Sequence, residues 1–376
     1  MFNLPRKITT NATPTYYSLI FFGIFVTLLL AGCGGEEIKR EEFVLAYPPP
    51  PEPTRFFFER TITSSFDVKE ITAADKLKIF ATGTLGTATG LGKPYGVAVY
   101  HGRIYVTDTV KRAVLMFDVP GKDFKVIGTE GPGQLRKPIG IAVSKQGEIY
   151  VADNSAKRVV VFDKDGKFLR AFGNRNILRR PSGVAVSPDG TKAYVIDTGG
   201  VTTQEHHLYI FNAISGELEK TIGTRGRKEG EFNLALQVTT GPDGTIYVTD
   251  SGNFRVQAFN PDGSFKMSFG KVGRKLGNFA RPKGIATDSD GNIYVVDSAF
   301  GNFQIFNSKA QLLMFIGQRS QTPGPGRYML PAGIAVDEDG RVYMVDQFFR
   351  KVDVYRPAGI EKTGGWLGGE HLPKDK

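Results

Sequence analysis

The stretch Ile149-Tyr150-Val151-Ala152-Asp153 decides the fold of this chain, because close copies of it recur along the sequence. Every copy has tyrosine second and aspartate last, and the other copies are residues 104–108, 193–197, 246–250, 293–297 and 342–346. Successive aspartates lie 45, 44, 53, 47 and 49 residues apart. A period of this length, with several strands per unit, is typical of β-propeller blades. The sequence therefore predicts an all-β fold, a six-bladed β-propeller with four antiparallel strands per blade.

Each unit repeats the same internal order of elements. A Pro-x-Gly entry leads into a first strand, and a glycine-bearing turn such as Asp243-Gly244 leads into the tyrosine strand. Asp-Gly suits this position because tight hairpins need positive φ angles. Two units depart from the pattern. The third has extra residues within 199–207, and the fourth has Ala235 and Gln237 where the others have proline and glycine.

Two stretches of the chain resemble a known repeat family: Val151 to Asp163 (VADNSAKRVVVFD) and Gly252 to Phe259 (GNFRVQAF). They resemble the NHL-repeat family, and the likeness extends over about residues 93–357. The resemblance implies a six-bladed propeller used mostly for binding. It also implies a minority of enzymes among related propellers, such as the amidating and streptogramin lyases.

The sixth unit supplies only three strands, so the ring needs a fourth strand from elsewhere to avoid an open edge. Residues 55–62 (RFFFERTI) resemble the other fourth strands, which predicts that an N-terminal strand closes the last blade. Residues 77–80 are the alternative closing strand. The apolar spacing over residues 68–80 is closer to that of a short helix.

The N-terminus reads as a targeting signal. Arg6 and Lys7 precede a short apolar run that ends in Leu30-Ala31-Gly32-Cys33, and Cys33 is the sole cysteine. This resembles the bacterial lipobox, which implies cleavage before Cys33 and lipidation on it; an ordinary signal peptide is the alternative. The resemblance is to the bacterial lipoprotein type and implies a lipid-anchored protein of the bacterial cell envelope. Gly34 after the cysteine favours the outer membrane over the inner one.

The chain divides into four parts by composition. Residues 1–32 are the predicted lipoprotein signal peptide, and residues 33–54 hold the lipidated cysteine and a stiff proline-rich spacer. Residues 55–357 form the propeller, and residues 358–376 are predicted to be a flexible tail. Trp366, the sole tryptophan, either docks on the last blade or contacts a partner.

The formal net charge is +10, and the cations concentrate in the links between blades and in the turns after the tyrosine strands. These links and turns share one face of a propeller. Two neighbouring links are predicted to form one basic patch: Arg225, Arg227, Lys228, Lys271, Arg274 and Lys275. Such a patch suits an anionic ligand or an acidic protein partner. The other interpretation is a solvated face that balances the repeated aspartates, which themselves are expected to bind backbone N–H groups of their own turns.

Little in the sequence indicates catalysis. With Cys33 alone, disulfides, thiolate catalysis and covalent c-type haem are excluded. His206 and His207 in the irregular loop are site candidates, but adjacent strand residues point to opposite faces and cannot easily share one metal ion. We therefore expect no catalytic residue, no metal, no other cofactor and no nucleic acid partner, and the oligomeric state stays open.

The predicted function is a lipid-anchored envelope propeller that acts as a non-catalytic binding or scaffold subunit. Its partner would be an anionic ligand or an acidic protein, with a cytochrome-associated envelope complex as one setting. The alternative is an envelope lyase or hydrolase with its site at the mouth of the propeller channel.

Overall fold

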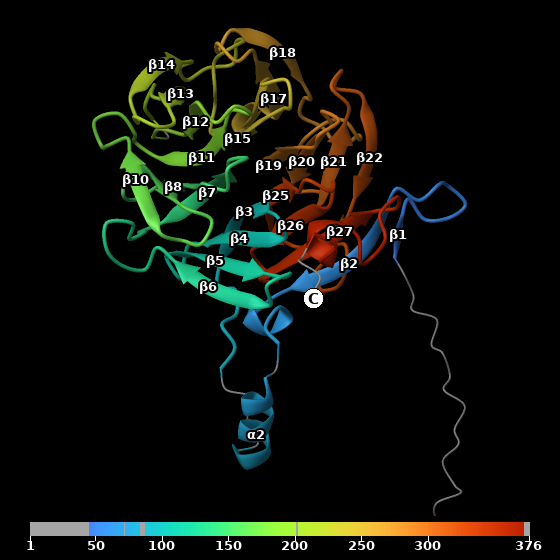
Figure 1. Cartoon of the computed structure of the whole chain (residues 1–376). Coiled ribbons are helices and arrows are strands. Elements are labelled where there is room, and N and C mark those ends of the chain that lie inside the picture. The colour runs from blue at the N-terminus through green and yellow to red at the C-terminus, as the bar shows by residue number, and fades with distance from the viewer. Residues whose placement is uncertain (1–44, 71, 83–86, 201, 372–376) are drawn as a thin grey trace, which may run out of the picture. The chain divides into compact units, whose positions relative to one another are not determined.

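The computed structural model describes residues 45–70, 72–82, 87–200 and 202–371, and their strands form a ring of large antiparallel sheets (Figure 1). The predicted signal peptide and Cys33 lie outside the described residues. No helix in the described part of the chain is long and apolar enough to cross a bilayer.

Five blades are continuous in sequence, each with four strands in sequential order. Blade 1 has β3 (Pro94–Tyr100), β4 (Arg103–Asp108), β5 (Ala113–Asp118) and β6 (Asp123–Ile127); blade 2 has β7 (Pro138–Val143), β8 (Ile149–Asp153), β9 (Arg158–Phe162) and β10 (Phe168–Phe172). Blade 3 has β11 (Pro181–Val186), β12 (Lys192–Asp197), β13 (His207–Asn212) and β14 (Leu218–Ile222). Blade 4 has β15 (Ala235–Thr240), β16 (Ile246–Asp250), β17 (Arg255–Phe259) and β18 (Phe265–Phe269); blade 5 has β19 (Pro282–Thr287), β20 (Ile293–Asp297), β21 (Asn302–Phe306) and β22 (Leu312–Ile316).

Blade 6 joins the two ends of the propeller and confirms the predicted closure. Its strands lie in the order β1 (Ala46–Tyr47), β2 (Phe56–Ile62), β27 (Lys351–Pro357), β26 (Val342–Asp346) and β25 (Pro331–Val336). β2 pairs antiparallel with β27, with Phe58 opposite Tyr355 and Ile62 opposite Val352. The short β1 was not expected, because it falls within the segment interpreted as a spacer. Residues 77–80 belong instead to helix α2 (Ala73–Thr82), as the helical spacing predicted.

The first strands surround the axis of the ring. They contact one another in the closed order β3, β7, β11, β15, β19, β25 and back to β3. Glycine in the Pro-x-Gly entry allows this close approach, because a Cβ added to Gly284 would lie 2.4 Å from the carbonyl oxygen of Ala332 in the next blade. Apolar side chains then fill the space between neighbouring blades, as where Met116 of blade 1 packs in one cluster with Val151 and Phe162 of blade 2.

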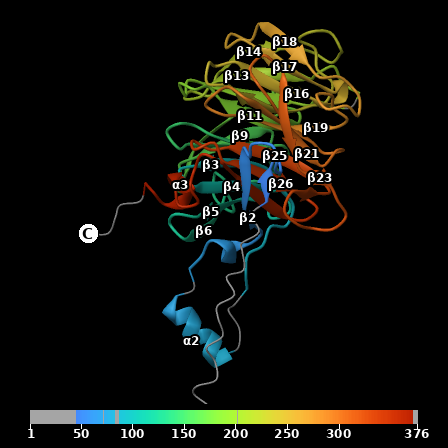
Figure 2. The ribbon, with the colours of Figure 1, turned by 90° about the vertical axis from the view of Figure 1, so that its right-hand side faces the viewer.

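Short elements complete the described chain: the 3-10 turns Ser65–Asp67 and Ser251–Asn253, the paired β23 (Gln318–Arg319) and β24 (Arg327–Tyr328), and helix α3 (Gly365–Gly368). Figure 2 places α3 beside β3 and β4. The Trp366 ring stacks on His101 with centroids 3.8 Å apart, and the backbone N–H of Trp366 donates to the Asp339 carboxylate of blade 6 at 2.6 Å. Leu367 is buried, so this part of the tail is docked. This agrees with the interpretation that Trp366 docks on the last blade and differs from the prediction of a flexible tail. The glycine-rich composition gave no indication that Leu367 is buried beside Trp366.

Candidate functional site

The predicted basic patch lies in two neighbouring links of the ring. Residues 223–234 connect blades 3 and 4, and residues 270–281 connect blades 4 and 5. The links have the same geometry, since each is closed by a parallel bridge, Arg225 to Phe232 in one and Val272 to Phe279 in the other. They lead into β15 and β19, which contact each other. Gly-Arg-Lys therefore occupies equivalent positions in adjacent links.

The side chains of the basic patch are free to meet a partner. Arg225 is half-buried, and the other five side chains are exposed. No side chain of the six forms an ion pair or hydrogen bond with another described residue. One carboxylate lies within the patch, since Glu231 accepts the backbone N–H groups of Arg227 and Lys228 at 2.9 Å, but it pairs with none of the six cationic side chains.

Buried glutamines hold both links in place from beneath. Gln257 donates to the Glu231 carbonyl at 2.8 Å and accepts from the Gly230 N–H at 3.0 Å. Gln304 does the same in the next blade, with 3.0 Å to the Asn278 carbonyl and 2.7 Å from the Gly277 N–H. Because these amides satisfy backbone groups of the links, the backbone that carries the cations has a fixed conformation.

Several other cations of this face have structural roles, which the sequence analysis did not anticipate. Arg158, Arg255 and Lys351 stand first in their third strands and bind carbonyls of the preceding link: Arg158 those of Pro132 and Gln134, Arg255 those of Lys228 and Glu231, and Lys351 that of Gly324. Arg255 also pairs with Asp250 at 2.9 Å. Fewer cations are therefore free to bind a partner than the predicted basic face implied.

The repeated aspartates are buried and structural, as predicted. Asp153 is representative: it accepts N–H groups from Ala156 in its own turn and from Arg136 and Lys137 in the incoming link. The bond to the incoming link was missed by sequence reasoning. Asp250 differs, because within its own turn it binds side chains, those of Asn253 and Arg255, instead of N–H groups.

His206 joins the two places where the repeat breaks. Its Nδ1 accepts the Leu234 N–H at 3.1 Å, and its Nε2 lies 3.1 Å from the Gly200 carbonyl, so the ring is neutral with its proton on Nε2. Burial lowers the pKa of His206. His207 binds the Gly223 carbonyl at 2.8 Å. Both imidazoles thus support the irregular loop and the entry of blade 4.

The axis of the ring holds a cavity of about 220 Å³, lined by all six first strands. In the described part of the chain no three His, Cys, Asp or Glu side chains are grouped to hold a metal ion. Lys283 lies in β19 next to Gly284 of this lining, and burial lowers its pKa to about 8. Sequence reasoning missed it, although it is the one charged residue in the middle of a Pro-x-Gly entry or its equivalent.

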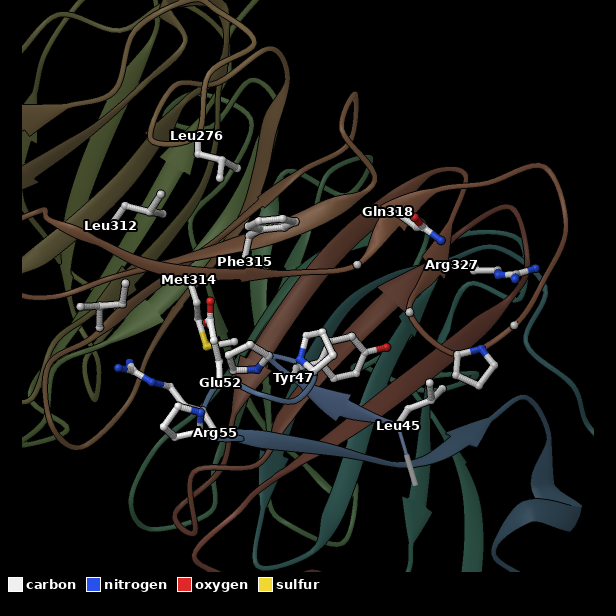
Figure 3. A pocket seen from close by; sticks show the side chains of 18 of the residues that line it. Leu45, Tyr47, Glu52, Arg55, Leu276, Leu312, Met314, Phe315, Gln318 and Arg327 are labelled. Atoms are coloured by element: carbon white, nitrogen blue, oxygen red, sulfur yellow. The ribbon is translucent and has the colours of Figure 1, made fainter. Parts of the chain in front are cut away.

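A larger groove of about 940 Å³ lies at the rim, between blade 5 and the N-terminal segment (Figure 3). On one side stand Leu276, Leu312, Met314 and Phe315; on the other are Leu45 and Tyr47 of the chain entering blade 6. Arg55 and Arg327 lie at its ends. No part of the sequence predicted this groove, because its walls come from three segments far apart in the chain.

Comparisons with known proteins identify the repeat. The family model described as NHL repeat matches residues 135–162, 232–259 and 279–306. Tripartite motif-containing protein 3 of Mus musculus is 33% identical over 101 residues, which is 23% of this chain and 14% of that protein. Tripartite motif-containing protein 2 of Homo sapiens is 42% identical over 55 residues, 15% of this chain and 7% of that protein. The match therefore spans only a small part of these relatives.

Solved structures share the fold. A protein of unknown function from Bacteroides thetaiotaomicron is 16% identical with a TM-score of 0.58, covering 79% of this chain and 75% of that one. A gluconolactonase from Xanthomonas campestris is 18% identical with a TM-score of 0.53, covering 71% and 86%. A streptogramin B lyase is 15% identical with a TM-score of 0.52, covering 71% and 94%. At these identities the likeness extends to the fold alone.

Proposed function

Because this chain is a six-bladed β-propeller that contains NHL repeats, we propose that it is a non-catalytic binding subunit whose basic patch docks an acidic protein. The observation that carries the proposal is the pair of equivalent links. They present six cations without ionic partners on a backbone that buried glutamines fix. Positive charge carried by a fixed backbone attracts and orients an oppositely charged partner, and only the exposed side chains have to be ordered on binding.

Exposed charge acts mainly on the rate and specificity of association. Salt screens it over about 8 Å at physiological ionic strength. Capture of the partner should therefore weaken steeply as salt rises.

The test is capture from detergent-solubilised envelopes followed by mass spectrometry. The test variant reverses four exposed cations of the patch: Arg227→Glu, Lys228→Glu, Arg274→Glu and Lys275→Glu. A matched control reverses four exposed lysines in turns at the opposite end of the strands: Lys145→Glu, Lys164→Glu, Lys167→Glu and Lys309→Glu. We expect the test variant to lose an acidic partner that wild type and control retain. Retention of that partner by the test variant at low salt would refute docking at the patch.

We also propose that the protein is lipid-anchored through Cys33 in a bacterial envelope, with the outer membrane favoured. Support comes from Leu30-Ala31-Gly32-Cys33 and from the absence of a second cysteine. Two or more acyl chains anchor a protein stably, since each buried methylene contributes about 0.8 kcal/mol. Cys33→Ser should release the protein from membranes or leave it unprocessed. Mature wild type that fractionates as soluble without detergent would contradict the anchor.

The non-catalytic role is proposed on the geometry of the histidines. His206 and His207 are committed to backbone carbonyls, so neither is free to act as a metal ligand or base without local rearrangement. A lyase or hydrolase at the channel mouth is the alternative, because propellers of this fold include a lyase and a gluconolactonase. Thermal shift with Zn²⁺, Mn²⁺ and Mg²⁺ tests it: a metal-dependent rise in melting temperature that Lys283→Met or His206→Gln removes would favour the enzyme.

A further inference from the structure

We propose that the groove between blade 5 and the N-terminal segment binds an extended apolar segment of the acidic partner. In this arrangement the segment adds to the sheet of blade 5 along the free edge of β22. The inference rests on the proposed docking at the basic patch and assigns the partner a second, apolar contact.

The outer strand of blade 5 is more apolar at its exposed positions than the outer strand of blade 4. β22 reads Leu-Leu-Met-Phe-Ile, with Leu313 and Phe315 40% and 45% exposed. The corresponding positions in β18 are Lys266 and Ser268. Proteins usually protect edge strands with charged side chains, because an unpaired edge accepts another strand. β22 lacks that protection.

The edge itself is available. Among the described strands β22 is the last of its sheet and pairs only with β21, so alternate N–H and C=O groups face outward. Across the groove stands β1, which is likewise the last strand of its sheet. A volume of about 940 Å³ lies between these walls. An added strand is one known way in which an extended peptide binds a sheet edge, with alternate side chains filling pockets.

The ends of the groove define the charge of its ligand. Arg55 and Arg327 stand there, and no ion pair with a described residue neutralises either of them. Among the described residues that line the groove, Glu52 is the sole carboxylate. An apolar segment flanked by acidic residues therefore complements the groove better than one flanked by basic residues.

The groove is continuous with the basic patch. Leu276 lines the groove, is 51% exposed and directly follows Arg274 and Lys275 in the link to blade 5. One partner can therefore cover both surfaces, with acidic side chains on the patch and apolar side chains in the groove. This continuity favours the same acidic protein over an unrelated ligand.

The wall beside blade 6 is preformed. Lys351 is buried and donates to the Gly324 carbonyl at 2.6 Å, and it pairs with Asp353 at 2.5 Å. Below the same wall, the hydroxyls of Tyr328 and Tyr355 lie 2.5 Å apart. These contacts hold the loop that carries Gly324 and Arg327, so a ligand meets a shaped groove and need not order it.

The experiment selects ligands without knowing the partner. A display library of random peptides, each of about ten residues and so longer than a typical strand, is selected on the full-length protein in lipid nanodiscs. Affinities of the enriched peptides are then measured by fluorescence polarisation. The groove variant is Leu313→Asn with Phe315→Asn, and the matched control is Leu169→Asn. Leu169 is 41% exposed at the equivalent position of β10 in blade 2.

We expect enriched peptides in which apolar residues alternate and acidic residues flank them. Their binding should weaken about tenfold or more in the groove variant, stay unchanged in the control, and fall when alternate peptide amides are N-methylated. Peptides that bind the groove variant equally well, or that carry basic flanks, would overturn the inference. So would binding that emerges only after residues 36–44 are deleted, which would assign the groove to the chain's own segment. A dimer that dissociates in the groove variant would assign the groove to a second copy.

The experiments can refute the proposal for the patch and the proposal for the groove independently. If the four-cation reversal abolishes partner capture while no groove-dependent peptide is found, the proposed function stands and this inference falls. If groove-dependent peptides are found but the reversal leaves capture intact, the patch is not the docking site and the proposed function falls.

Discussion

Removing the Glu59 carboxylate should destabilise the propeller, because that group joins the N-terminal strand to the body of blade 6. Glu59 of β2 accepts from Arg341 at 2.8 Å, with side chains 1% and 0% exposed. Arg341 also donates to the Gly364 carbonyl at 2.8 Å. Glu59→Ala removes the nearer counter-charge of the buried guanidinium and leaves only the Asp339 carboxylate, 3.6 Å away. Loss of one partner of a buried pair typically costs about 3–5 kcal/mol.

This cost corresponds to a measurable shift in melting temperature. Unfolding entropy is about 2 cal/mol/K per residue, so a folded unit of about 300 residues loses on the order of 1.5 °C per kcal/mol. Glu59→Ala should therefore melt about 4.5–7.5 °C below wild type in thermal scans followed by circular dichroism. Glu52→Ala, an exposed carboxylate of the same segment, is the control and should change little.

A compensating variant separates the charge from the packing. Glu59→Leu with Arg341→Met replaces the pair by apolar side chains, which is often neutral or stabilising in buried sites. It should recover most of the loss. If Glu59→Ala melts within about 1 °C of wild type, the buried ion pair between β2 and Arg341 does not stabilise blade 6, and this reasoning is wrong.

The remaining predictions concern single side chains. His101→Ala should shift the fluorescence emission of Trp366 to longer wavelength, because the stacking ring that shields the indole is removed. Burial lowers the pKa of His206 below its ordinary value of 6.5. The neutral ring therefore contributes its full stability above pH 6.5, and this contribution is lost as pH falls toward the lowered pKa. His206→Gln should flatten the acid side of a melting-temperature profile. Gln257→Leu should weaken partner capture while the strands remain folded, as circular dichroism can check, because one link loses its support. The rate at which an amine-specific acylating reagent labels Lys283 should reach half its maximum near pH 8, where its pKa lies, and a midpoint above pH 10 would contradict the assigned burial.

The fold could be predicted because the repeated residues bind backbone groups that recur in every blade. Each tyrosine strand ends in an aspartate that is buried and binds N–H groups of the incoming link, as Asp153 does, so the residue recurs wherever the same turn recurs. Closure by β2 could be predicted for a related reason: residues 55–62 have the apolar pattern of an outer strand, and only blade 6 lacked one. Residues 46–47 gave no such signal, since two residues beside prolines are too short to show a period.

The candidate site could be predicted only in part, because charge in a sequence does not reveal its contacts. Arg227 and Arg274 are exposed, whereas Arg255 and Lys351 lie under links and bind carbonyls there. All four look alike in a list of cations. The groove could not be predicted for another reason. Its walls meet only when the ring closes, so the sequence around Phe315 alone does not indicate a groove.

The closure of blade 6 also dictates an order of events during biosynthesis. Thr61 of β2 donates to Asp353 of β27 at 2.7 Å, and these partners are 292 residues apart in the chain. The N-terminal strand, with Phe56, Phe57 and Phe58 in a row, must remain unpaired until nearly the whole polypeptide has left the ribosome. Contacts of such long sequence separation form late and slowly, and an unpaired apolar strand invites aggregation meanwhile. A chaperone that shields this strand until the last blade arrives would thus govern the yield of closed rings.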